Sequence, residues 1–110
     1  MRRRVLNTMK RLEIVLERDQ LPWVRQVLQE HATGYTLVPG CTGFGHHGFH
    51  EGELVLLVTV VTLEHLDPIL DALLPLLDRR SGVVLISDVQ VPRGEHFIPE
   101  VRDRMLQRQR

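Results

Sequence analysis

The feature that most constrains the fold of this chain is the segment Leu54 to Thr62, which is almost wholly apolar and rich in β-branched residues. A strand with one face in solvent would alternate apolar and polar residues, so this run is typical of a central strand with both faces covered. The sheet that contains this strand therefore needs a layer of protein on each side.

The segments before this run predict a strand, a helix and a second strand. Apolar and charged residues alternate from Arg11 onward, which indicates a half-buried strand. Asp19 is expected to cap a helix that ends at His31 and packs Trp23 in the core or in an interface. Tyr35 to Pro39 is then expected to form the second strand, with an irregularity at its end.

The segments after this run predict a second helix and a fourth strand. A broad stripe of leucines indicates an amphipathic helix that opens at Thr62 or Glu64. Pro75 is expected to kink or shorten its last turns, because proline removes a backbone hydrogen bond. Ser81 and Gly82 form a tight turn into a strand from Val83 to Val91.

The order strand, helix, strand, strand, helix, strand predicts an α+β, ferredoxin-like βαββαβ subunit with both helices on one face of the sheet. Since the other face would be bare, we expect the chain to assemble through it into a closed trimer. At 110 residues the chain suits one domain. We predict an N-terminal extension at 1–8, the domain at 9–97, and a tail at 98–110 with a weak helix at 101–109.

Charge and composition exclude several function classes. Fourteen basic residues balance fourteen acidic ones, so no overall field favours nucleic acid or a membrane surface. The single cysteine, the absence of a long apolar run and the absence of a signal peptide suit a cytoplasmic protein. No nucleophile motif, P-loop lysine or zinc-protease motif is present, so we expect no enzyme activity.

A glycine-rich segment with three histidines is the candidate binding loop, expected at 42–53. Glycine allows close approach of the backbone to a ligand, while histidine binds protons or metals. Three interpretations of its polar residues stay open. In the first, His46, His47 and His50 are metal ligands. In the second, the segment is a polar loop that becomes ordered when a ligand or partner binds. In the third, its backbone amides and a protonated histidine bind an anion.

Several short motifs together resemble the PII signal-transduction superfamily over residues 9 to 97. They are Met9 to Ile14, Gly34-Tyr35-Thr36, Gly43-Phe44-Gly45 and Arg93-Gly94. The resemblance implies a homotrimer of ferredoxin-like subunits that binds an adenine nucleotide (ADP, AMP or ATP) in clefts between subunits. It also implies a T-loop, here at 42–53, that docks on a membrane transporter or an enzyme.

The resemblance further implies which residues contact the nucleotide. Gly34, Tyr35 and Thr36 would lie near the base and ribose, Gly43 to Gly45 beside the phosphates, and Arg93 would pair with a phosphate. The full set implied for nucleotide binding is Gly34, Tyr35, Thr36, Gly43, Phe44, Gly45, His46, Ser81, Gly82 and Arg93.

Three departures from the nitrogen-regulatory pattern point to a divergent PII-like branch. The loop is shorter and lacks the tyrosine that is uridylylated in many relatives, the phosphate turn is reduced to residues 79–82, and His46-His47 replaces arginine and glutamine. This branch accompanies bicarbonate transport, carboxysomes or metal efflux. We therefore expect a sensor of adenine nucleotides, with bicarbonate as a candidate second ligand, that controls an inorganic-carbon transporter or a carboxysome-related protein. The alternative is a metal-binding accessory protein of a heavy-metal efflux system, and a third hypothesis is a small hydrolase that acts on a nucleotide.

Overall fold

The computed structural model describes residues 5–32, 34–45, 48–93 and 97–98, which form a four-stranded sheet with two α-helices. The first half of the chain folds as β1 (Leu6–Glu17), a short 3-10 helix (Arg18–Gln20) and α1 (Leu21–His31). The second half folds as β2 (Thr36–Gly45), β3 (Gly48–Val61), α2 (Leu63–Asp78) and β4 (Gly82–Pro92). No helix in this described part of the chain combines the length and hydrophobicity that a membrane span requires.

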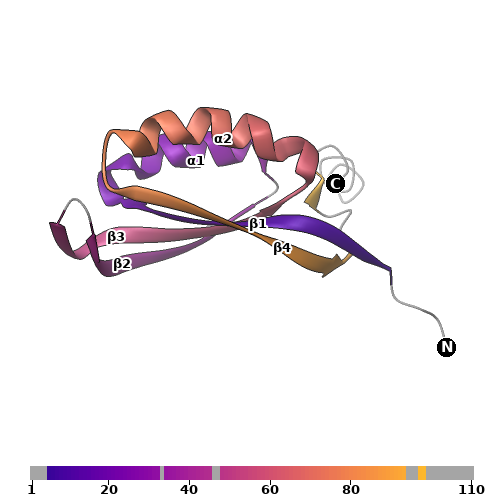
Figure 1. Cartoon of the computed structure of the whole chain (residues 1–110), viewed down its shortest axis with the longest axis horizontal. Coiled ribbons are helices and arrows are strands. Elements are labelled where there is room, and N and C mark those ends of the chain that lie inside the picture. Colours follow the sequence, from indigo (N-terminus) through magenta and orange to yellow (C-terminus); the bar gives the residue numbers. More distant parts are fainter. Residues whose placement is uncertain (1–4, 33, 46–47, 94–96, 99–110) are drawn as a thin grey trace, which may run out of the picture.

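The strands lie in the order β2-β3-β1-β4, and every neighbouring pair is antiparallel. Figure 1 shows α1 and α2 side by side on one face of this sheet. The predicted α+β class and the ferredoxin-like βαββαβ arrangement are therefore confirmed. The apolar run that begins at Leu54 falls in β3, one of the two central strands, as expected.

The core lies between the helices and the inner face of the sheet. Ile14 pairs with Leu57, and Leu16 pairs with Val55. Directly paired residues of neighbouring strands point to the same face, and these four side chains are almost fully buried. Burial of each such side chain contributes about 1.5 to 3 kcal/mol. They pack against residues from both helices, namely Val24 and Leu28 of α1 and Ile69, Leu73 and Leu77 of α2.

The outer face of the sheet carries many apolar side chains beside the Arg11–Glu13 ion pair of β1, and no described element lies against it (Figure 1). Val15 pairs with Leu56 on one side and with Val83 on the other, so these three side chains share that face. Leu85 lies two residues after Val83 in β4, on the same face, and is 55% exposed. The expected bare face of the sheet is present in the described part of the chain.

The loop expected at 42–53 is a two-stranded β-ribbon for most of its length, so that prediction was wrong. We define the ribbon as residues 41–45 of β2 and 48–53 of β3. Its pairs run from Gly43 with His50 out to Gly45 with Gly48, and Cys41 pairs with Leu54 at its base. In Figure 1 it projects beyond the ends of the helices. The connection at 46–47 lies outside the described residues.

The glycines of this region allow β-bulges, and both strands continue past them. The pairing register of β2 and β3 shifts twice between Val38 and Gly43. Gly40 and Gly52 have φ angles of 68° and 67°, which suit a bulge and which other residues adopt at a cost. The predicted irregularity at Pro39 and Gly40 is confirmed, whereas the end of the strand expected there was wrong.

The first strand is longer than its alternating pattern indicated. β1 begins at Leu6, and Leu6, Asn7 and Thr8 pair with the last three residues of β4. The strand thus reaches into the segment that we expected to lie outside the fold. The division into 1–8, 9–97 and 98–110 stays a prediction, and the helix expected at 101–109 lies outside the described residues.

The start of α1 also differs from expectation. The residue at its cap is Gln20, which makes no side-chain capping bond, and Asp19 lies one position earlier in the 3-10 helix. Trp23 is 57% exposed, so it is not a core residue of the single chain. A role for Trp23 in an interface stays a prediction.

Candidate functional site

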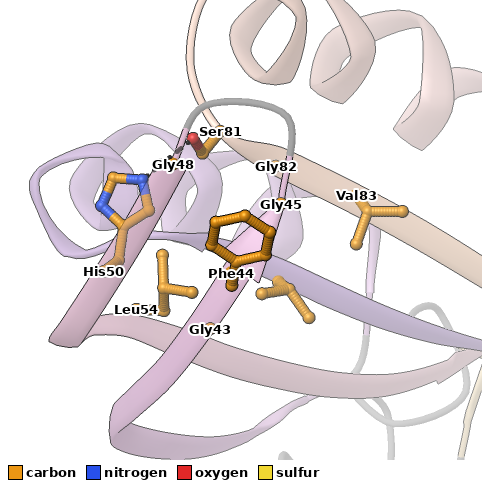
Figure 2. A pocket seen from close by; sticks show the side chains of 10 residues that line it. Gly43, Phe44, Gly45, Gly48, His50, Leu54, Ser81, Gly82 and Val83 are labelled. Carbon is orange, nitrogen blue, oxygen red and sulfur yellow. Dashed lines mark hydrogen bonds between the residues drawn. The ribbon is translucent and has the colours of Figure 1, made fainter.

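A pocket of about 290 Å³ lies where the ribbon meets the end of β1 and the start of β4 (Figure 2). The outer-face residues Val15 and Val83 form part of its wall, so the pocket opens beside the bare face of the sheet. Its full lining is Val15, Gly43, Phe44, Gly45, Gly48, His50, Leu54, Ser81, Gly82 and Val83.

The pocket unites two motifs that the sequence singled out separately. Gly43, Phe44 and Gly45 come from the ribbon, whereas Ser81 and Gly82 come from the turn between α2 and β4. Half of the ten implied nucleotide-binding residues therefore line one cavity, and the pairing of β1 with both β3 and β4 brings them together.

Two of the lining glycines are closely packed against leucine side chains. A Cβ added to Gly43 would lie 2.8 Å from Leu54 Cδ1, and one added to Gly82 would lie 2.7 Å from Leu77 Cδ2. Both distances are shorter than real side chains permit, so each position excludes a larger residue unless its neighbour moves. The absence of a side chain thus lets the backbone at Gly43 and Gly82 lie close to Leu54 and Leu77.

The turn before β4 is anchored to the end of β1 by a carboxylate. Glu17 Oε2 accepts hydrogen bonds from the Ser81 backbone N–H at 3.0 Å and from Arg80 Nε at 3.1 Å. Arg80 also donates to Asp19, and these hydrogen bonds, first to Asp19 and then to Glu17, raise the pKa of Arg80. The Ser81 amide is engaged by this carboxylate, so the polar group that Ser81 presents to the pocket is its hydroxyl.

His50 faces that hydroxyl from the ribbon. Its Nε2 lies 3.2 Å from Ser81 Oγ, and its Nδ1 lies 3.5 Å from Glu53 Oε2. The side chain of His50 is only 17% exposed. Figure 2 shows the imidazole and the serine hydroxyl joined at the rim of the pocket.

The sequence singled out His50 for a different role, as a metal ligand together with His46 and His47. Those two residues lie outside the described part of the chain. Among the described residues, no group of three or more His, Cys, Asp or Glu side chains is placed to hold a metal ion. The alternation of the ribbon strands would have placed His50 opposite Gly43, but only if residues 48–53 had been recognised as a strand.

Gly34, Tyr35 and Thr36, which are also implied for nucleotide binding, lie away from this pocket. Tyr35 accepts a hydrogen bond from Arg25 Nε at 2.6 Å, and the Gly34 carbonyl accepts one from Thr59 at 2.6 Å. Thr36 pairs with Val58, which is eight positions along β3 from His50, or about 26 Å at about 3.3 Å per residue.

Arg93 lies farther still. It directly follows β4, whose Pro92 pairs with Leu6, whereas Gly82 at the pocket pairs with Leu16. Ten strand positions separate these pairs, which corresponds to about 33 Å. Arg93 also has a φ angle of 61°, an uncommon value for a residue other than glycine. One copy of the chain therefore does not bring all of the implied residues into one site.

Comparison with protein-family models matches residues 9–96 to a family described as nitrogen regulatory protein P-II. Comparison with curated protein sequences gave no match.

Solved structures give a more detailed likeness. A structure of CPII, a nitrogen regulatory PII-like protein from Thiomonas intermedia K12 bound to ADP, AMP and bicarbonate, is 30% identical with a TM-score of 0.83, covering 87% of this chain and 99% of that one. Another structure of CPII, bound to ADP and bicarbonate, is 33% identical with a TM-score of 0.82, covering 86% and 99%. A putative PII-like signaling protein from Thermus thermophilus is 27% identical with a TM-score of 0.71, covering 84% and 98%.

Proposed function

Because this chain belongs to the nitrogen regulatory protein P-II family, we propose that it is a homotrimeric PII-like regulator that senses adenine nucleotides in clefts between its subunits. Bicarbonate is the proposed second ligand. The ribbon at its edge is proposed to dock on a partner, an inorganic-carbon transporter or a carboxysome-related protein, and to act by regulation and not by catalysis.

The observation that carries this proposal is the pocket at the root of the ribbon. It combines a glycine-rich wall with the Ser81-Gly82 turn, and a backbone without side chains can approach phosphate oxygens closely. CPII, which is about 30% identical over most of its length, is described as bound to ADP, AMP and bicarbonate. We assign the phosphates to Gly43, Phe44, Gly45, Ser81 and Gly82, with His46 beside them.

Assembly is proposed because the single chain leaves both the sheet and the site incomplete. The apolar outer face lacks a cover among the described residues, and burial of such a face drives association. The pocket opens beside that face, so a neighbour that packs there would also border the pocket. Pro92, the residue before Arg93, lies ten strand positions or about 33 Å from Gly82 in its own chain, so we propose that a neighbouring copy supplies Arg93.

The base and ribose are assigned to Gly34, Tyr35 and Thr36. These residues are about 26 Å along β3 from His50 in the same chain, which again favours contributions from two copies. Tyr35 is held by Arg25, whose guanidinium carbon lies 5.9 Å from the centre of its ring.

The ribbon is the proposed partner-binding element. Phe44 and Phe49 pair directly across it and are 83% and 62% exposed. Exposed aromatic side chains of this kind are common at protein interfaces. Phe44 also lines the pocket, so a bound ligand and a docked partner would share this residue. Ligand binding alters docking only if the ligand contacts one arrangement of the ribbon better than another.

Titration calorimetry tests the proposal directly. ADP, AMP and ATP would each be titrated into the purified protein with and without bicarbonate, and zinc and copper would be titrated separately. We expect saturable heat from at least one nucleotide. Heat from a metal alone, with none from any nucleotide, would contradict the proposal and favour the efflux-associated alternative.

A further inference from the structure

The two polar side chains that line the pocket, His50 and Ser81, belong to different parts of the fold. His50 lies in the ribbon, whereas Ser81 lies in the turn that β1 anchors (Figure 2). Within the described residues, the other side-chain hydrogen bonds of the ribbon join partners in β2 and β3 themselves. The contact between His50 and Ser81 is thus the polar side-chain link between the described ribbon and the turn.

The position of His50 is defined by three neighbours, which are Gly43, Glu53 and Ser81. Its backbone partner is Gly43, which has no side chain to compete for the pocket. Glu53 lies against Nδ1, on the side of the ring away from Ser81. With 17% of the side chain exposed, the ring is oriented so that Nε2 faces the serine hydroxyl.

These two residues supply the side-chain hydrogen-bond donors among the residues that line the pocket. A hydroxyl and an imidazole N–H each donate one hydrogen bond, and the two can converge on the oxygens of one phosphoryl or bicarbonate group. The other lining side chains are glycine or apolar, and the Ser81 amide is already bonded to Glu17.

We propose that His50 and Ser81 together bind an oxyanion group of the ligand, and that their mutual hydrogen bond is the ligand-free form of this subsite. This inference rests on the proposed function, which already assigns Ser81 to the phosphates, and adds His50 as a second side chain that binds the anion. Since His50 is part of the ribbon, exchange of the serine for the ligand changes how the ribbon is attached to the turn. Ligand binding at this subsite would therefore change the attachment of the ribbon, which is the proposed docking element.

Nuclear magnetic resonance of protein labelled with 15N-histidine tests this proposal on the wild-type chain. The His50 resonances, assigned by their loss in His50→Gln, would be followed during titration with ADP, adenosine, inorganic phosphate and bicarbonate. We expect ADP and phosphate to move them if the anion is a phosphoryl group, and bicarbonate to move them if it is the second ligand. Adenosine, which carries no anion, should leave them in place.

A second test measures the affinity of variants for the anion. We expect His50→Ala and Ser81→Ala each to weaken binding of the anion that moves the resonances by about tenfold, the effect of one charge-assisted hydrogen bond. His31→Ala, at the end of α1 and outside the pocket lining, is the matched histidine control and should bind as the wild type does.

The outcomes separate this inference from the proposed function. If ADP binds but no anion moves the His50 resonances, the subsite is wrong while the nucleotide sensor stands. If none of ADP, AMP and ATP binds, the nucleotide sensor is wrong, and the phosphate and bicarbonate titrations still decide the subsite. A shift with either anion would support it, and no shift would overturn it.

Discussion

Gly82 is required by the space around it and not by its backbone angle. A Cβ at this position would lie 2.7 Å from Leu77 Cδ2 and 3.3 Å from the backbone oxygen of Val15. Because Leu77 is buried and Val15 belongs to β1, neither neighbour can move freely. We expect Gly82→Ala to lower the free energy of unfolding by about 1 to 3 kcal/mol, measured by chemical denaturation.

Gly34→Ala is the control for that substitution. Nothing lies within 4 Å of a Cβ at Gly34, so the change should alter stability much less than the change at Gly82. Equal losses for the two variants would show that close packing is not what selects glycine at Gly82.

Arg93 carries the proposed contact between neighbouring copies. Loss of its charge-assisted hydrogen bonds in Arg93→Ala should weaken nucleotide binding by about 1 to 3 kcal/mol, measured by calorimetry with ADP. Arg93→Lys keeps the charge but loses the forked geometry of the guanidinium, so it should bind with intermediate affinity. Unchanged affinity in Arg93→Ala would remove this residue from the site.

At the scale of residues, the sequence predicted the composition of the pocket better than its geometry. Gly43 and Ser81 were both expected near phosphates, and both line the pocket, because a family motif records residue types at given positions. The bond between His50 and Ser81 joins residues 31 positions apart, and no local spacing encodes such a contact. His50 was grouped with His46 and His47 because they are close in sequence, which says little about strands where side chains alternate.

At the scale of elements, patterns of buried side chains predicted the central strands and both helices. Alternation and apolar runs report on burial, so they worked for β1, β3 and the helices, whose core residues are buried. They failed in the ribbon, where both faces are largely exposed and glycine is frequent. There the backbone pairing of two strands sustains the structure, and that pairing leaves no hydrophobic pattern to detect.

The helix α2 offers a test of backbone energetics. It runs through Pro75 to Asp78, so this proline does not end the helix, although the ring removes one backbone hydrogen bond. Pro75 is exposed, and its replacement by alanine removes no core contact. We expect Pro75→Ala to raise the free energy of unfolding by about 1 to 2 kcal/mol, after the greater entropy of the unfolded chain is included.

Thermal and chemical denaturation measure that effect, and Ala72→Gly is a useful counterpart. Glycine in the same helix should lower stability by about 1 kcal/mol. If Pro75→Ala destabilises the protein instead, the proline has a packing role that the exposed position does not indicate.

At the scale of the whole molecule, the outer face of the sheet governs assembly. Leu85 is 55% exposed there, and a charge at its position would be buried without a partner in a trimer. We expect Leu85→Asp to dissociate the trimer and to abolish nucleotide binding, as seen by light scattering and calorimetry. Leu63→Asp is the control, because Leu63 is 67% exposed at the start of α2, where aspartate suits the helix terminus.

Sedimentation velocity of the protein with ADP, recorded at the absorbance of the nucleotide, tests assembly and binding together. We expect ADP to sediment with a particle of about 38 kDa, which is three copies of the 12.7 kDa chain. A single 12.7 kDa particle that leaves ADP behind would contradict this expectation.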